Sequence, residues 1–254
     1  MSFNFNKIGA VILAGGRGTR LKCAKTPKAM LELSGRPIVS YLVETLQQMN
    51  FTPDRICVVV GENRDKIINF FGQAVTCAIQ EVPKGTAHAA YTGAMALPAG
   101  VEQMLVVNGD DGAFYTAETL TNFISNHFDA GAAVSLLSVI PDKFELYGRI
   151  TKDEKGKAII VEKESLNEEQ KKIKETSSGT FCLDKNWFIK IFPDMPPMKK
   201  LGEYGLPTVL DMANGQNLPV QIIKLADPSQ WFGINTPEEL EEARRRKNET
   251  SKQK

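Results

Sequence analysis

Residues 12–28 read I-L-A-G-G-R-G-T-R-L-K-C-A-K-T-P-K, an apolar run that leads directly into a glycine-rich, basic loop. The aliphatic residues before the loop are typical of a buried strand in a parallel sheet. Gly15, Gly16 and Gly18 permit positive φ angles, so main-chain N–H groups of the loop can converge on an anion. The stretch predicts an α/β fold with a phosphate-binding loop after a central strand.

Basic side chains surround this loop. A triphosphate carries roughly four negative charges, and each cation at ~4 Å contributes about 4 kcal/mol at an effective dielectric of ~20. The spacing lacks the third glycine of a dinucleotide fingerprint and the G-K-[ST] of a P-loop. A glycine-rich turn is also common in α/β proteins that bind no phosphate, so the loop is either a different kind of phosphate site or a plain turn. The basic residues are Arg17, Arg20, Lys25 and Lys28.

The composition fits one large α/β domain, with two small domains as the alternative, because 42% of the 254 residues are hydrophobic. A formal charge of +1 supplies no overall field that would attract nucleic acid or an anionic membrane. Residues 1–7 contain no apolar signal region, and no apolar run approaches the ~18 residues that span a bilayer. Scattered cysteines argue against zinc and disulfides, and we expect a cytoplasmic protein. The cysteines are Cys23, Cys57, Cys77 and Cys182.

Short apolar runs in the first half of the chain are typical of strands in a mostly parallel sheet. A helix is predicted from Ile38 to Met49, because apolar residues recur there at helical spacing. Strand, helix and strand in this order favour a right-handed βαβ crossover. The predicted strands are residues 11–14, 56–60, 77–80 and 105–107.

The second half of the chain predicts further elements. Pro237 and the acidic residues after it are typical of a helix start. We expect one domain over residues 5–247 and a frayed tail over residues 248–254. The other predicted elements are an apolar run at 132–140, a hairpin of 149–151 and 158–161, a charged helix at 168–175, a strand at 178–183 and a helix at 185–192.

One carboxylate lies where ligands of open α/β sheets bind. Residues 104–110 read M-L-V-V-N-G-D, which places Asp110 just past the end of a predicted buried strand. Ligands of such sheets bind beyond the carboxyl ends of the strands. Asp110 is therefore a candidate site residue.

Seven motifs follow one another along residues 8–243. They are L-A-G-G-R-G-T-R-L with Pro27 and Lys28, I-Q-E-V-P-K-G-T-A-H-A at 79–89, N-G-D at 108–110, Y-G-R-I at 147–150, I-V-E at 160–162, G-E-Y at 202–204 and G-I-N-T at 233–236. With these motifs the chain resembles the sugar nucleotidyltransferase (pyrophosphorylase) family, most closely the uridylyltransferase domain of bacterial N-acetylglucosamine-1-phosphate enzymes. The resemblance implies a single-domain, Rossmann-like and GT-A-like nucleotide-diphospho-sugar transferase fold, with helices on both faces of a mixed, mainly parallel sheet.

The resemblance also implies a nucleotide site. In the family, the glutamine at the position of Gln80 and the glycine at that of Gly85 hold uracil, and a side-chain amide complements the amide edge of a pyrimidine. Without the motif around it, Gln80 would be interpreted as a surface residue. His88 is interpreted as part of the pocket wall or helix start, and His127 as structural. The implied nucleotide-binding residues are Leu13, Ala14, Gly15, Gly16, Gly18, Thr19, Gln80, Gly85 and Thr86.

Asp110 and Asn235 correspond to the family's magnesium ligands, and carboxylate and amide oxygens suit Mg²⁺. The alternatives are a surface aspartate and a helix-capping asparagine. Asp111 departs from the family's G-D-x-P pattern, and its carboxylate either tightens metal binding or faces solvent. The resemblance makes Arg20, Lys28 and Asp110 the catalytic residues.

The resemblance places the sugar against Gly148, Glu162, Ser177 and Gly179. The N-acetylglucosamine enzymes have N-T-G where this chain has Ser177-Ser178-Gly179, which leaves the N-acetyl preference open. Between Arg20 and Lys28 the chain has one residue more than the N-acetylglucosamine enzymes. This makes the loop resemble that of hexose-1-phosphate enzymes.

The implied reaction joins UTP and a sugar 1-phosphate, N-acetylglucosamine 1-phosphate or a related hexose 1-phosphate, to give a UDP-sugar and pyrophosphate with Mg²⁺ as cofactor. Glucose 1-phosphate or another nucleoside triphosphate is an alternative substrate. A nucleotide-sugar-binding regulator without turnover is an alternative from another class. In each case we expect no nucleic-acid or membrane partner.

Overall fold

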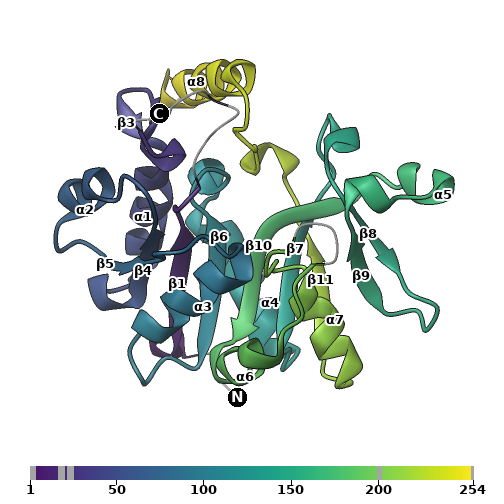
Figure 1. Ribbon diagram of the computed structural model, residues 1–254. Helices are drawn as coiled ribbons and strands as arrows, with labels where there is room; N and C mark the ends of the chain where they lie inside the picture. Colours follow the sequence, from purple (N-terminus) through teal and green to yellow (C-terminus); the bar gives the residue numbers. More distant parts are fainter. Residues whose placement is uncertain (1–3, 17–20, 22–25, 199–201, 253–254) are drawn as a thin grey trace.

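The computed structural model describes residues 4–16, 21, 26–198 and 202–252. Seven strands form one sheet in the order β11–β7–β10–β6–β1–β4–β5 (Figure 1). β10 runs antiparallel to both of its neighbours, whereas the other strands share one direction. The predicted mixed, mainly parallel sheet is confirmed. The strands are β1 (Ile8–Leu13), β4 (Ile56–Val60), β5 (Thr76–Ile79), β6 (Gln103–Asn108), β7 (Val134–Val139), β10 (Thr176–Asp184) and β11 (Val220–Lys224).

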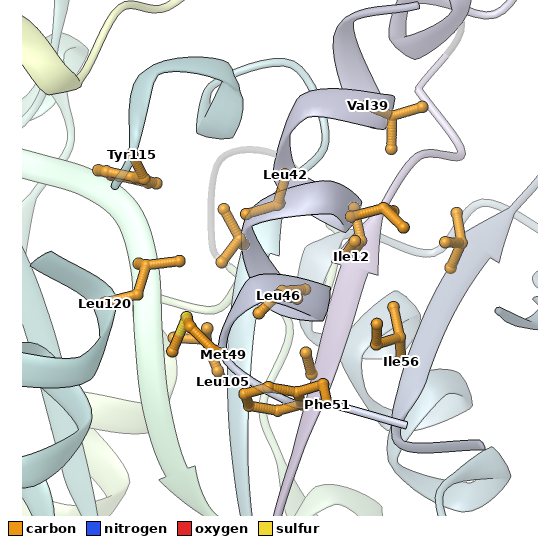
Figure 2. Packing of buried hydrophobic residues seen from close by; sticks show 14 of the residues in the cluster. Ile12, Val39, Leu42, Leu46, Met49, Phe51, Ile56, Leu105, Tyr115 and Leu120 are labelled. Atoms are coloured by element: carbon orange, nitrogen blue, oxygen red, sulfur yellow. The ribbon is translucent and has the colours of Figure 1, made fainter. Parts of the chain in front are cut away.

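Helices cover both faces of the sheet, as predicted. Alternate residues of β1 enter two different cores, because successive strand side chains point to opposite faces. Ile12 belongs to one hydrophobic cluster with residues of α1, α2 and α4, and Val11 belongs to a second cluster with residues of α3, α6 and α7. In Figure 2, Leu42 and Leu46 of α1 face the side of the sheet that carries Ile12 of β1 and Leu105 of β6. The helices are α1 (Ile38–Gln48), α2 (Asp65–Phe71), α3 (Thr86–Ala96), α4 (Ala117–Asp129), α6 (Lys185–Ile191) and α7 (Thr208–Gly215).

A two-stranded hairpin lies beside the main sheet. β8 (Arg149–Lys152) and β9 (Ala158–Val161) pair antiparallel, which confirms the predicted hairpin. The charged helix predicted at 168–175 is shorter, since α5 covers only Glu168–Lys171. A capping box between Asn167 and Gln170 starts α5, but none of its residues is buried, so no packing extends it.

Helix α8 (Pro237–Lys252) covers the short hairpin of β2 (Glu32–Leu33) and β3 (Arg36–Pro37). α8 continues as far as Lys252 into the stretch for which the sequence predicted a frayed tail. Ser34 Oγ donates a 2.6 Å hydrogen bond to Asn248 Oδ1, and Arg245 pairs with Glu249 one turn along the helix. Strand β11 lies in a stretch for which the sequence predicted no element.

Among the described residues, no helix is long and apolar enough to cross a bilayer. Cys57, Cys77 and Cys182 are free thiols, and Cys23 lies outside the described residues.

Candidate active site

The carboxyl ends of the central strands lie along one edge of the sheet. Leu13 ends β1, Gln80 follows β5 and Asn108 ends β6, and all three line one cavity of about 360 Å³. We call it the Gln80 cavity; its other lining residues are Gly15, Gly16, Leu21, Lys28, Pro83, Gly85, Thr86, Ala89, Asp110, Glu203 and Asn235. The sequence prediction that the strand ends form one site is consistent with this geometry.

Lys28, Asp110 and Asn235 meet in this cavity. Lys28 Nζ forms an ion pair with Asp110 Oδ2 and donates a 2.9 Å hydrogen bond to Asn235 Oδ1. The side chains of the ion pair are 14% and 20% exposed, so water screens their charges only weakly. Asp110 and Asn235, which are distant in sequence, therefore both direct a side-chain oxygen at Lys28 Nζ.

Each of these residues is held by local structure. Lys28 begins a 3₁₀ turn, in which Met30 N donates to Pro27 O at 2.8 Å. Asn235 precedes α8, and Glu239 Oε2 accepts hydrogen bonds from the main-chain N–H groups of Asn235 at 2.6 Å and Thr236 at 3.0 Å. The carboxylate of Glu239 thus caps α8 and fixes the main chain of Asn235.

Asp111 follows Asp110 and is half-buried. Its Oδ2 accepts a 2.9 Å hydrogen bond from Asn108 Nδ2. Burial, together with the charge of Asp110, raises the pKa of Asp111, although Lys28 and Asn108 act in the opposite direction. Asn108 therefore holds the half-buried carboxylate of Asp111 beside the site.

The first part of the glycine-rich loop forms the near wall of the cavity. Leu13, Gly15 and Gly16 line it, and Ala14 lies behind, where its N–H donates to Val59 O at 2.8 Å. The main chain of Gly15 lies close to Gly61 and Gln80, since a Cβ there would be in van der Waals contact with Gly61 N at 3.4 Å and Gln80 Oε1 at 3.6 Å. The remaining predicted loop residues, Gly18, Thr19 and Arg20, lie outside the described residues.

Gln80, Gly85 and Thr86 form the far wall. Gly85 adopts φ +107°, and a Cβ there would lie 2.5 Å from Tyr204 O, so only glycine fits. Tyr204 of the G-E-Y motif docks on this turn, since Ala87 N donates to Tyr204 O at 2.8 Å. Thr86 Oγ1 accepts from Leu206 N at 3.0 Å. Two motifs that are distant in sequence therefore form one wall.

His88 contacts Gln80 of this wall, a pairing that sequence reasoning missed. His88 Nδ1 lies 2.8 Å from Gln80 Nε2. Gln80 directly follows a predicted strand, and His88 lies in the first turn of the next helix. This short separation is the sequence signal that could have indicated the pair. Burial, with the nearby Lys84 charge, lowers the pKa of His88 and favours a neutral ring.

A second cavity, of about 280 Å³, lies next to the first. Thr86, Asn108 and Glu203 line both cavities. We call it the Glu162 cavity; it is lined also by Ser177, Gly179, Phe181, Met198, Gly205, Leu206 and Pro207. Three of the four residues predicted to bind sugar, Glu162, Ser177 and Gly179, therefore share one cavity.

Gly148, the fourth, packs behind Glu162. A Cβ on Gly148 would lie 2.7 Å from Val161 O and 3.3 Å from Glu162 Cα, so a glycine is needed for this approach. Thr176 Oγ1 donates a 2.7 Å hydrogen bond to Gly148 O. Burial, with the charge of Glu164, raises the pKa of Glu162.

Arg149 supports this turn and was also missed. The side chain is 2% exposed, and Nη1 donates to the carbonyl oxygens of Tyr147 and Gly148. Its guanidinium lies 5.1 Å from the centre of the Phe144 ring. The sequence signal for this role was an arginine in a predicted strand. If such a charged side chain is buried, it needs hydrogen-bond partners inside the protein.

The donor set fits a divalent cation. Asp110 and Asn235 supply a carboxylate and an amide oxygen, the ligands that Mg²⁺ takes while it keeps several waters. The ammonium group of Lys28 lies between these oxygens and marks the point at which a cation is stabilised.

Comparison with known proteins shows similarity to nucleotidyl transferases. The family model described as nucleotidyl transferase matches residues 9–249. The proteins called bifunctional protein GlmU are 33% identical over 236 residues in Pelotomaculum thermopropionicum and 31% identical over 242 residues in Geotalea daltonii. These alignments cover 92% and 94% of this chain but 51% and 52% of the relatives, so the chain spans about half their length.

A solved structure described as a glucose-1-phosphate thymidylyltransferase of Bacillus anthracis, in complex with sucrose, shares the fold. Its TM-score is 0.76 at 20% sequence identity, with 94% of each chain covered. The nucleotide-sugar transferase fold expected from the sequence is therefore confirmed.

Proposed function

The chain belongs to the nucleotidyl transferase family, and we propose that it transfers the uridylyl group of UTP to a sugar 1-phosphate, giving a UDP-sugar and pyrophosphate. The observation that carries this proposal is the meeting of Lys28, Asp110 and Asn235 in the Gln80 cavity, which shares lining residues with the Glu162 cavity. One cavity offers a base-reading amide and a glycine loop, and the other offers a carboxylate for sugar hydroxyls. The GlmU relatives support this choice of substrates.

The chemistry requires little proton transfer. A sugar 1-phosphate has a second pKa of about 6, so it is mostly a dianion at neutral pH and can attack the α-phosphorus without a general base. Catalysis then depends on alignment and on neutralising charge. Lys28 is the described cation in position to bind the phosphate oxygens at the reacting centre, and Arg20 is proposed for the β- and γ-phosphates.

Asp110 and Asn235 would hold Mg²⁺. When bound, Mg²⁺ would supply positive charge that stabilises the phosphate oxygens. The flexible side chain of Lys28 would bind the phosphate oxygens beside it.

The sugar is proposed to be N-acetylglucosamine 1-phosphate or a related hexose 1-phosphate. Ser177 Oγ accepts a 3.0 Å hydrogen bond from Gly179 N, so this hydroxyl is engaged in the turn and offers less to an N-acetyl group than an asparagine would. Glucose 1-phosphate therefore belongs in any substrate panel.

The test is a panel of UTP, dTTP, CTP, ATP and GTP against several sugar 1-phosphates, with pyrophosphate release as the readout. We expect release with UTP and at least one hexose 1-phosphate. Nucleotide binding by calorimetry without pyrophosphate release from any pair would favour a regulator instead. Release with another nucleotide but not with UTP would contradict the proposed nucleotide.

A further inference from the structure

The side-chain amide of Gln80 is held in one orientation. Gln80 is 7% exposed, and its Nε2 donates to Gly85 O at 3.2 Å and approaches His88 Nδ1 at 2.8 Å. A carbonyl oxygen only accepts hydrogen bonds, so the atom that faces Gly85 O must be the amide nitrogen. Both hydrogens of Nε2 are then used, one by Gly85 and one by His88.

The protonation of His88 follows from this arrangement. Nδ1 must be unprotonated to accept the hydrogen of Gln80, so the ring is neutral with its proton on Nε2. Burial and the Lys84 charge both disfavour the cation. A protonated Nδ1 would instead require Gln80 to present its oxygen to His88, and Gly85 O would lose its donor.

The ring of His88 is itself supported. Its centre lies 6.0 Å from that of Phe192, which stacks on Tyr91 at 4.3 Å. Thr92 Oγ1 donates to His88 O at 2.9 Å. The imidazole therefore has a fixed position from which to act on Gln80.

The remaining Gln80 atom, Oε1, is available to a ligand. Oε1 accepts no hydrogen bond among the described residues and faces the Gly15 side of the Gln80 cavity, 3.6 Å from where a Cβ on Gly15 would lie. An oxygen at this place accepts from the ring N3–H of uracil or thymine. Cytosine offers an acceptor at N3, so the two acceptors would oppose each other.

We propose that His88 is a positioning residue: it fixes the Gln80 amide with Oε1 toward the nucleotide cavity, so that the site selects uracil or thymine over cytosine. This inference rests on the proposed function, because it assumes that a nucleoside triphosphate places its base at Gln80. His88 acts through Gln80 and does not itself touch the base.

The tautomer can be observed directly. The chain has two histidines, so the ring nitrogens of the ¹⁵N-labelled protein give few signals by NMR, and a His88→Asn variant assigns them. We expect an unprotonated Nδ1 and a protonated Nε2 for His88 at neutral pH. A proton on Nδ1 would overturn the inference.

Two variants test the selectivity. The Oδ1 atom of His88→Asn lies near the place of Nδ1 and accepts a hydrogen bond, whereas His88→Leu fills the space without an acceptor. We expect the Leu variant to lower the UTP-to-CTP ratio of kcat/KM about tenfold, mostly through the KM for UTP, and the Asn variant to keep most of it. An unchanged ratio in the Leu variant, or an equal loss in both variants, would contradict the proposal.

Binding separates this inference from the proposed function. Calorimetry with UTP and CTP needs no turnover, so a UTP preference that the Leu variant loses and the Asn variant keeps supports the role of His88 even if no pyrophosphate is released. Wild-type protein that binds CTP as tightly as UTP overturns it even if turnover occurs. If the Leu variant fails to fold, the tautomer and the Asn variant decide.

Discussion

The two cavities of the cleft are built in different ways. The Gln80 cavity lies at the ends of β1, β5 and β6, and every residue of β1 is buried in the core. The Glu162 cavity includes the residue that directly follows β9, and every residue of β9 is only partly buried. Hydrophobic packing therefore sets the geometry of the first cavity.

Hydrogen bonds to main-chain atoms hold the second cavity in place. Thr176 and Arg149 donate to Gly148 O, and Ile150 N donates to Glu175 O at 3.1 Å. Such bonds contribute about 0.5–1.5 kcal/mol each, less than the burial of a large core side chain. We infer that substitutions near the hairpin change sugar use at a smaller cost in stability than substitutions beside β1.

The largest expected effect is on catalysis, at Asp110 of the Gln80 cavity. Asp110→Asn keeps the side-chain shape but removes the charge that pairs with Lys28, so we expect kcat to fall about 100-fold or more. Thermal unfolding should change little, because the core does not include this carboxylate. An equal loss of stability and activity would indicate a structural role, and Glu81→Gln, in an exposed ion pair, is the matched control.

A matched pair of core substitutions tests the difference in packing. Ile12→Ala in β1 should lower the free energy of unfolding by about 2–5 kcal/mol, because the side chain is 0% exposed. Ile160→Ala in β9 removes the same atoms from a partly buried position and should cost less than half as much. Urea unfolding of both variants measures this, and equal losses would refute the comparison.

His127 of α4 contacts residues of both β6 and β7, and its ring can titrate. Its ring bonds Ser135 of β7 at 2.8 Å and Gln103 of β6 at 2.9 Å, and burial lowers its pKa from 6.5 to about 4. Between these pH values the unfolded chain binds more protons than the folded one, so stability falls as the pH falls.

The loss from pH 6.5 to about pH 5 should be about 2 kcal/mol, at 1.36 kcal/mol per pH unit. Urea unfolding across this range measures it. His127→Asn keeps an acceptor for Ser135 but does not titrate, so the difference between variant and wild type should shrink toward low pH. A difference that stays constant with pH would contradict the buried, neutral state.

The smallest expected effect concerns the Gly148 turn. Thr176→Val removes the hydroxyl that donates to Gly148 O but keeps the shape of the side chain. We expect the KM for the sugar 1-phosphate to rise by about tenfold or less, with the KM for UTP nearly unchanged. Steady-state kinetics with each substrate varied gives both values. A matching rise in the KM for UTP would show that the two cavities are not independent.

The sequence predicted the elements with strong local patterns. β4 and the β8–β9 hairpin lie close to their predicted bounds, because apolar runs and turn residues define them locally. α5 and the end of α8 differ, since a few exposed contacts decide how far a charged helix extends. β11 was missed because it is short and the polar residue Gln221 interrupts its apolar run. None of its residues is fully buried.

The order of apolar runs, glycines and polar residues along the sequence was enough to determine the fold class. It also determined the edge of the sheet at which the site lies, because parallel strands have their carboxyl ends at the same edge. Only the tertiary structure decided the contacts within the site. Lys28 bonds an asparagine 207 residues away, and the orientation of Gln80 depends on the ring of His88. Such contacts depend on distances between atoms that local sequence patterns do not specify.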